Sequence, residues 1–153
     1  MISALSLSSL LLFASAAFAA SASNPLPDGC FKTQNLCTTM TWTLKPSIGQ
    51  KGTVRVYFYN KDQGAAQQPV FEKPSVAQIS ILARNTHSES VAHEAKVTQA
   101  KTKEGSEFEG VYDASEVEFF GEGQTEITAR FLDQDGKILE DVKLFDAFSV
   151  DSN

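Results

Sequence analysis

The strongest constraint on the fold is a two-residue alternation of apolar and polar side chains that recurs along this chain. Between residues 124 and 132, the apolar residues Ile127, Ala129 and Phe131 are separated by polar ones. The same pattern runs through residues 53–59. Because successive side chains of a β-strand point to opposite faces, this alternation predicts strands with one face in a core and the other in solvent.

Short segments of this kind, rich in β-branched and aromatic residues, fill most of the chain between turn signals such as Asp133–Gly136. No segment shows a convincing helical period. The pattern predicts an all-β fold, an immunoglobulin-like antiparallel Greek-key β-sandwich of about seven or eight strands. The expected strands are 36–44, 53–59, 77–83, 93–101, 108–112, 117–120, 124–132 and 137–144.

The start of the chain predicts export. Residues 1–20 contain no charged side chain, and Ala17-Phe18-Ala19 is a small-x-small cleavage site. This is typical of a secretory signal peptide, here residues 1–19. A membrane anchor is the alternative, but the apolar run is too short to span a bilayer of roughly 30 Å. We therefore expect a flexible arm at 20–35, one domain at 36–153, and no membrane span in the mature form.

Cys30 and Cys37 are the only cysteines of the chain. In an oxidising compartment two such thiols usually pair, which predicts a disulfide. Closing a loop of about eight residues contributes roughly 2–2.5 kcal/mol on the loop-entropy account. The bond would then tether the N-terminal arm rather than hold the whole fold. Lipidation of Cys30 is the alternative, but Pro27-Asp28-Gly29 is a poor lipoprotein signal.

The charge of the chain argues against one class of partner. The formal net charge is −6, so nucleic acid is not an expected partner. The balance is uneven, because 14 acidic residues and only three basic ones follow Lys103. In a sandwich the two halves of the chain interleave, so much of this asymmetry is expected to be solvated surface.

Several short motifs lie along the mature chain: Leu36-Cys37, Trp42, Pro46, Gly49, Gly110-Val111-Tyr112, Val117, Phe119-Phe120, Gly123 and Glu126-Ile127. Together they resemble the YtkA-like group of bacterial extracytoplasmic domains, which is related to FixH-like domains. The resemblance runs from about residue 36 to residue 150. It implies an immunoglobulin-like sandwich in the periplasm or on the surface of a bacterium, or secreted from it.

Members of that group often carry a Trp-Met-Pro-x-Met-Gly-His-Gly segment, whose methionines and histidine suggest copper. The corresponding stretch here is 82–89, in which His87 matches the histidine while both methionines are absent. Thioether ligands are what select Cu(I). The resemblance therefore does not carry a copper site over to this chain.

His87 and His93 are the only histidines, and they have Glu89 and Glu94 close by in the sequence. Imidazole and carboxylate groups are ligands for zinc, so these residues are the candidate metal site. The alternative is a polar loop whose histidines are solvated or hydrogen-bonded to the backbone. We favour that alternative and expect no cofactor other than a possible metal ion.

Catalytic motifs are missing from the sequence. There is no Gly-x-Ser-x-Gly elbow, no phosphate-binding glycine loop, and no Ser or Cys with a recognisable base and orienting acid. We therefore expect that the protein is not an enzyme.

The sequence favours a non-enzymatic binding or protein-interaction domain of the bacterial envelope, monomeric, with an envelope or extracellular protein as its partner. Tyr57 and Tyr59 are candidate anchors of an interaction surface; alternatively, the N-terminal arm covers them. Two other functions stay open. One is a periplasmic copper or zinc protein that uses His87 and His93. The other is a structural subunit of a surface assembly, joined by strand addition.

Overall fold

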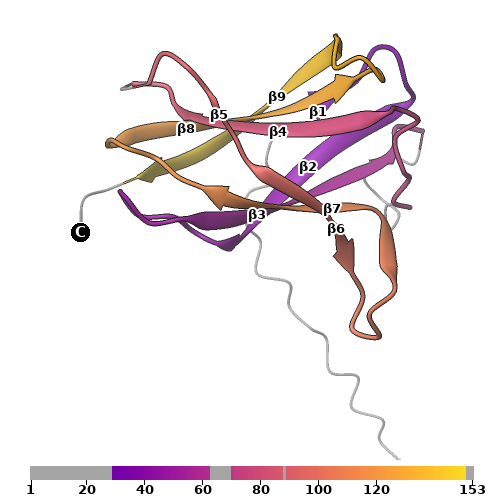
Figure 1. Ribbon diagram of the computed structural model, residues 1–153, viewed down its shortest axis with the longest axis horizontal. Helices are drawn as coiled ribbons and strands as arrows, with labels where there is room; N and C mark the ends of the chain where they lie inside the picture. Colours follow the sequence, from indigo (N-terminus) through magenta and orange to yellow (C-terminus); the bar gives the residue numbers. More distant parts are fainter. Residues whose placement is uncertain (1–28, 63–69, 88, 151–153) are drawn as a thin grey trace, which may run out of the picture.

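The computed structural model describes residues 29–62, 70–87 and 89–150, with only the backbone path for 145–150. The predicted signal peptide lies outside these residues. Two antiparallel sheets pack face to face (Figure 1). Sheet A has the order β1-β2-β3-β7-β6, and sheet B has the order β5-β4-β8-β9. The strands are β1 (Gly29–Cys30), β2 (Leu36–Leu44), β3 (Gly52–Asn60), β4 (Gln78–Asn85), β5 (His93–Glu94), β6 (Lys96–Lys101), β7 (Glu107–Val117), β8 (Gly123–Leu132) and β9 (Ile138–Val150).

The prediction of an all-β sandwich is confirmed, and the structure contains no helix among the residues it describes. The described residues form nine strands rather than the predicted seven or eight. The predicted strands at 108–112 and 117–120 were wrong as separate elements, because β7 runs without a break from Glu107 to Val117. Asp113, Ala114 and Ser115, which fall between the two predicted strands, pair with neighbouring strands as part of β7.

The core lies between the sheets and follows the alternation in the sequence. Val54, Val56 and Phe58 of β3 are completely buried. Phe58 packs against Phe131 of β8, with ring centroids 5.6 Å apart. Against Tyr112 of β7 it makes an edge-on contact at 5.7 Å. Aromatic pairs at these separations add to the burial of apolar surface, which is the main stabilising term of such a core.

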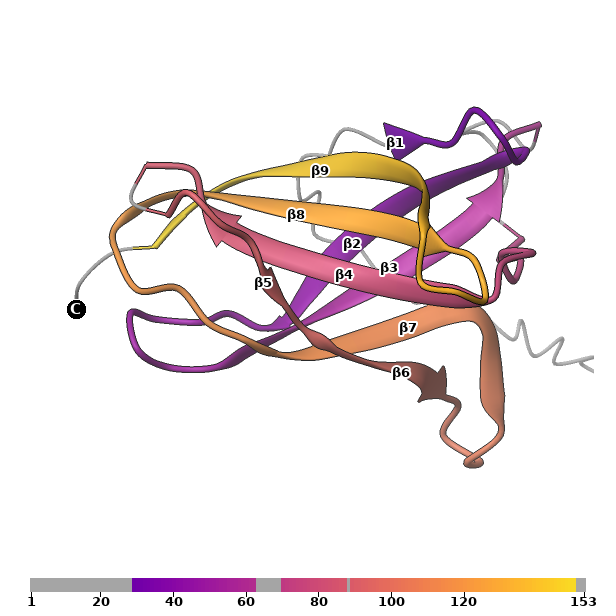
Figure 2. The same ribbon diagram turned by 45° about the horizontal axis from the view of Figure 1, so that its top comes forward.

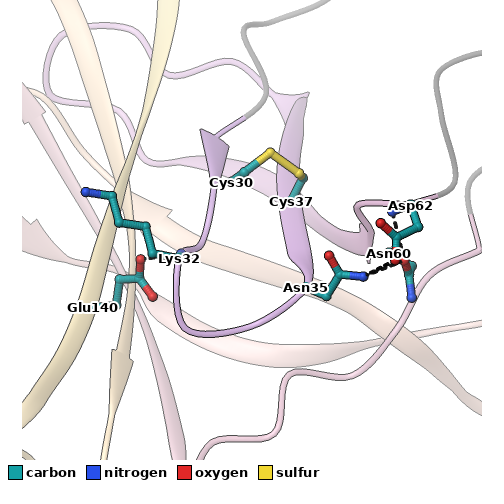
Figure 3. Close-up of a disulfide and its surroundings, with 7 residues drawn as sticks. All are labelled: Cys30, Lys32, Asn35, Cys37, Asn60, Asp62 and Glu140. Carbon is teal, nitrogen blue, oxygen red and sulfur yellow. Dashed lines mark hydrogen bonds between the residues drawn. A yellow bond between two sulfur atoms is a disulfide. The ribbon is translucent and has the colours of Figure 1, made fainter.

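The N-terminal residues close one lateral edge of the sandwich. Part of the region expected to be a flexible arm, residues 29–35, packs onto the two sheets: β1 pairs with β2, and Phe31 enters the core. The Phe31 ring stacks on Phe131 at 3.8 Å between centroids. Cys30 and Cys37 face each other in the ladder and form the predicted disulfide (Figure 3).

A carboxylate from the opposite sheet fixes the turn after β1. Glu140 of β9 accepts hydrogen bonds from the backbone N–H groups of Lys32 (2.6 Å) and Thr33 (3.1 Å) and from the Thr33 hydroxyl. Figure 3 shows Glu140 beside the Lys32 end of this turn. Burial alone would raise the pKa of Glu140, but these hydrogen bonds outweigh it and hold the pKa below its ordinary value. The turn therefore joins sheet A to sheet B.

At the other lateral edge, one predicted strand is divided between the two sheets. The sequence predicted a single strand at 93–101; instead β5 pairs with β4 in sheet B, and β6 pairs with β7 in sheet A. Between them, the N–H of Ala95 donates to the carbonyl of Ile81 at 2.8 Å, which is the last bond to sheet B. Figure 2 shows the chain leaving β4 at β5 and reaching β6 alongside β7. Such a crossing forms a corner of the sandwich.

Gly110 marks the point where β7 turns away from β3. Its φ is +71°, a left-handed conformation that favours glycine. A Cβ atom there would lie 2.5 Å from the backbone nitrogen of Glu72. The segment at Phe71 and Glu72 takes the place beside β3 that β7 leaves, and the Glu72 N–H donates to the Phe58 carbonyl at 2.9 Å. A side chain at position 110 would displace this segment.

Candidate interaction surface at one end of the sandwich

Three loops that are far apart in the sequence gather at one end of the sandwich. They are 45–51 between β2 and β3, 86–92 without residue 88 between β4 and β5, and 118–122 between β7 and β8. Figure 1 shows them together on the left. We call this group of described residues the loop end. Loops held by a rigid β-scaffold are where binding residues are commonly found.

Hydrogen bonds between the loops hold the loop end together. The Glu89 carboxylate accepts from the backbone N–H of Asn85 at 2.6 Å and of Phe120 at 3.3 Å. The Asn85 side chain donates to the Gly121 carbonyl at 2.5 Å, and the residue is fully buried. The N–H of Gly49 donates to the Phe119 carbonyl at 3.2 Å. These bonds give the three loops a defined arrangement in the absence of a partner.

Phe119 and Phe120 are neighbours in the sequence, but the Phe119 ring is buried in the core and the Phe120 ring is exposed. Phe119 is completely buried and packs edge-on against Trp42, with centroids 6.3 Å apart. Phe120 is 62% exposed, and Val91 in the neighbouring loop is 69% exposed. Both are large apolar side chains that lie outside the core. Exposed aromatic residues on a fixed scaffold are typical anchors of protein interfaces.

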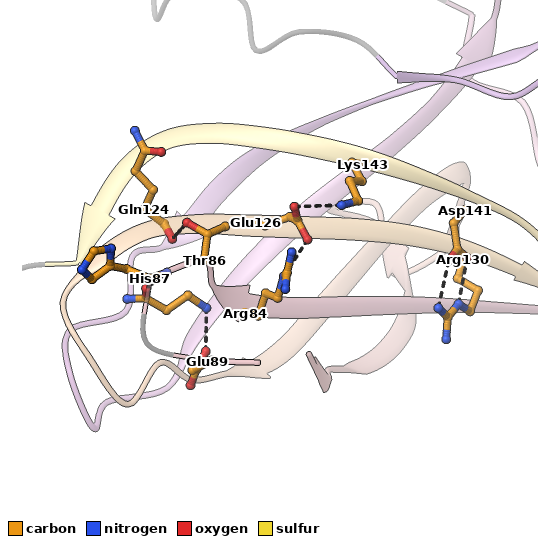
Figure 4. Close-up of polar contacts among 10 residues, drawn as sticks. Arg84, Thr86, His87, Glu89, Gln124, Glu126, Arg130, Asp141 and Lys143 are labelled. Carbon is orange, nitrogen blue, oxygen red and sulfur yellow. Dashed lines mark hydrogen bonds and ion pairs between the residues drawn. The ribbon is translucent and has the colours of Figure 1, made fainter. Parts of the chain in front are cut away.

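His87 belongs to the loop end and His93 lies beside it in β5, but the two histidines do not come together as a metal site. His93 places its Nε2 atom 3.5 Å from Glu89 and its ring 5.3 Å from the Phe120 ring, edge-on. His87 is exposed at the end of the sandwich (Figure 4). Its backbone N–H donates to the Asn85 side chain at 2.9 Å. Within the described ranges, no three His, Cys, Asp or Glu side chains converge on one point as metal ligands would.

Tyr57 and Tyr59 lie on the outer face of sheet A, where another segment covers them. Phe71 pairs with Tyr59 through the backbone, and its ring lies 5.2 Å from the Tyr57 ring. Phe108 packs edge-on against Phe71 at 5.7 Å. Among the described residues, Phe71 of the connection between β3 and β4 lies against both tyrosines; residues 20–28 of the predicted N-terminal arm lie outside the described residues. Tyr57 is half-buried in this cluster.

The outer face of sheet B carries ion pairs. Glu126, 7% exposed, joins Arg84 at 2.8 Å to Lys143 at 3.3 Å, and Arg130 pairs with Asp141 through two bonds of 2.8 Å (Figure 4). Burial alone would raise the pKa of Glu126, but the hydrogen bonds from Arg84 and Lys143 outweigh it and the pKa is lowered. Because these charges satisfy one another, this face offers little to a charged ligand.

Sequence reasoning missed three residues of the loop end: Val91, Phe120 and Glu89. Phe120 was interpreted as part of a strand, and only its position next to Phe119 hinted that one ring of the pair must leave the core. Glu89 was considered only as a metal ligand. Its carboxylate instead bonds to backbone groups of two segments, a role that depends on tertiary contacts.

Comparison with known proteins identifies no relative. No protein-family model, no curated protein and no solved structure matches the chain. The resemblance to YtkA-like and FixH-like domains therefore stays a prediction. A search of the described residues for a helix that could cross a membrane finds none.

Proposed function

We propose that this protein is a non-enzymatic, extracytoplasmic interaction domain that binds another protein through the loop end. The proposal rests on one observation: two apolar side chains are exposed on loops that hydrogen bonds hold in a fixed arrangement. Phe120 and Val91 are 62% and 69% exposed. The loops that carry them are held by hydrogen bonds that the buried Glu89 carboxylate accepts and by one that the buried Asn85 side chain donates.

Rigidity matters because ordering a loop on binding costs conformational entropy. A surface whose loops are already cross-bonded avoids part of that cost, so that each exposed apolar group contributes more of its burial energy to affinity. The partner is expected to present an apolar pocket for the Phe120 ring. The predicted signal peptide and the disulfide support a partner in the envelope or outside the cell.

Site-specific photo-crosslinking tests the proposal. A benzophenone amino acid replaces Phe120 in the full chain, and a second sample carries it in place of Lys143, on the outer face of sheet B. Both are illuminated in the envelope and secreted fractions of the cells that make the protein. We expect a discrete adduct from position 120 that excess wild-type protein abolishes, and none from position 143.

The matched competitor is the double variant Phe120→Ser, Val91→Ser, which keeps the loop hydrogen bonds of Glu89. We expect this variant not to compete for the adduct. Equal adducts from both positions, or competition by the double variant as strong as that by the wild type, would contradict an interface at the loop end.

A further inference from the structure

The two halves of the Cys30–Cys37 disulfide differ in their exposure to solvent. Cys30 is exposed in β1, the two-residue edge strand of sheet A, whereas Cys37 in β2 is only 3% exposed. In thiol–disulfide exchange a thiolate attacks one of the two sulfurs, so the rate depends on which sulfur the thiolate can reach. The fold therefore favours attack at Cys30.

A hollow in the surface lies beside Cys30. Its volume is about 310 Å³, several times the roughly 30 Å³ of one water molecule. Its described lining includes Lys32 and Lys61 and contains no acidic residue. The acidic residues Glu140 and Asp62 lie on opposite sides of the disulfide (Figure 3), and both accept hydrogen bonds from neighbouring residues. The hollow thus has room for a thiol, and its own residues do not repel a thiolate.

Contacts other than the disulfide also hold the turn after β1. Phe31 is 2% exposed in the core, and its N–H donates to the Leu36 carbonyl at 2.9 Å. The Glu140 carboxylate accepts from the backbone of Lys32 and Thr33. Opening a bond that closes a loop of about eight residues should therefore weaken this edge without unfolding the domain. We expect the protein to be folded in both the oxidised and the reduced state.

We propose that Cys30–Cys37 is a redox-exchange site of the folded protein, with Cys30 as the sulfur that a dithiol reductant attacks. The first thiolate of the reductant bonds to the Cys30 Sγ atom while the S–S bond breaks, and Cys37 leaves as a thiolate that takes a proton from water. The second thiolate of the reductant then displaces Cys30, which is protonated in turn. The reductant gives up two electrons and becomes a disulfide, and the protein gains two thiols.

This site is separate from the proposed loop-end interface. β2 runs from Leu36 to Leu44 and leads into the loop 45–51, so Cys37 lies at the opposite end of the strand from the loop end. Reduction should therefore loosen the edge at β1 and leave the loops around Phe120 in place.

The first test is the reduction of the oxidised full chain by dithiothreitol, followed by alkylation of the thiols and mass spectrometry. We expect a rate proportional to the dithiothreitol concentration that changes by less than about twofold in 1 M urea. This urea concentration raises the unfolded population of a small domain about fivefold or more. An acceleration of that size would mean that reduction requires unfolding, and it would overturn exchange in the folded state.

The second test identifies the attacked sulfur with two matched variants, Cys37→Ser and Cys30→Ser, each of which lacks the disulfide and keeps one thiol. Both are treated with oxidised glutathione, and mass spectrometry measures the mixed disulfide. We expect Cys30 to react at least about tenfold faster than Cys37, because a buried thiol is shielded from the reagent. Equal rates, or a faster reaction of Cys37, would overturn the assignment of Cys30. The Phe120 adducts are measured on the oxidised protein, so the loop-end proposal stands or falls separately.

Discussion

At one lateral edge of the sandwich, β1 and the turn after it join the two sheets; at the other, the chain crosses between sheets and leaves a groove that Val76, Ile79 and Val97 line. We call these the closed edge and the open edge. The closed edge combines a disulfide, the buried Phe31 ring and three hydrogen bonds to Glu140. The open edge has half-buried valines and the backbone edge of Ile79.

The difference shows that a sandwich of this size does not need both edges sealed. The rings of Phe31, Phe58 and Phe131 lie together toward the closed edge, where burial is complete. The open edge contributes less burial, and no described strand pairs with β4 at Ile79 on that side. The two edges are thus expected to contribute unequally to stability, and four substitutions test that difference.

The largest expected effect is that of Phe31→Ala. The ring is 2% exposed and stacks on Phe131 at the centre of the core. Its removal should lower the free energy of unfolding by about 3–5 kcal/mol. Denaturant unfolding followed by tryptophan fluorescence measures the loss. Phe31→Leu, which keeps most of the apolar volume, is the matched control and should lose much less. A loss below about 1 kcal/mol for Phe31→Ala would mean that β1 does not close this edge.

The second effect is that of removing the disulfide. Replacing Cys30 and Cys37 together by serine should lower the free energy of unfolding by roughly 2–2.5 kcal/mol, because the bond closes a loop of about eight residues. Calorimetry with and without a reductant checks this. The reductant should lower the midpoint of the wild type to that of the double variant and leave the variant itself unchanged. A reductant effect on the variant would show that the loss has another origin.

The third effect is that of Glu140→Gln. It should lower the free energy of unfolding by about 1 kcal/mol at pH 7, because the hydrogen bonds that residue 140 accepts from Lys32 and Thr33 lose their charge assistance. The pKa of Glu140 is lower in the folded state than in the unfolded state. Its ionised form therefore stabilises the fold above the unfolded pKa of about 4.3, and this contribution is lost as the pH falls through the folded value. Urea unfolding at pH 7 and pH 3 measures the difference in the free energy of unfolding between wild type and variant, which should be smaller at pH 3. The same difference at both pH values would mean that the charge of Glu140 is not the cause of the loss.

The smallest effect is expected at the open edge. Val97 is half-buried in the groove, so Val97→Ala should lower the free energy of unfolding by only about 1 kcal/mol. The same unfolding assay measures it beside Phe31→Ala. If Val97→Ala lowers the free energy of unfolding as much as Phe31→Ala does, the two edges do not differ in their contribution to stability.

Much of this fold follows from the alternation of side chains. The period-2 pattern located β2, β3 and β8 to within about a residue, because apolar and polar side chains alternate along each of them. The expectation of one solvated face was wrong for residues 125–129 of β8, which are buried on both faces because ion pairs and neighbouring strands cover the outer side. The presence of just two cysteines after a predicted signal peptide predicted their disulfide. These features depend on residues that are close together in the sequence, so the sequence was sufficient to predict them.

The features that distinguish the edges depend on tertiary contacts. Phe31 follows a stretch of Pro, Gly and Ser, and nothing near it in the sequence shows that it would stack on Phe131, 100 positions away. The crossing at Ala95 interrupts a pattern that alternates only weakly, so the sequence could not show which sheet each half joins. In the loop end, Glu89 acts through backbone groups of a loop 31 residues away.

Native-state hydrogen exchange measured by NMR tests the contrast between the edges most directly. The Phe31 amide donates to the Leu36 carbonyl at 2.9 Å beneath a buried ring, so it should exchange only through global unfolding. Backbone groups of alternate residues point to the same side of a strand, so the Ile79 amide points to the same side as the Ile81 carbonyl, which is the side of the groove. It should exchange orders of magnitude faster, although its neighbours Ser80 and Ile81 belong to the same strand. Protection of Ile79 equal to that of Phe31 in the free protein would contradict an open edge.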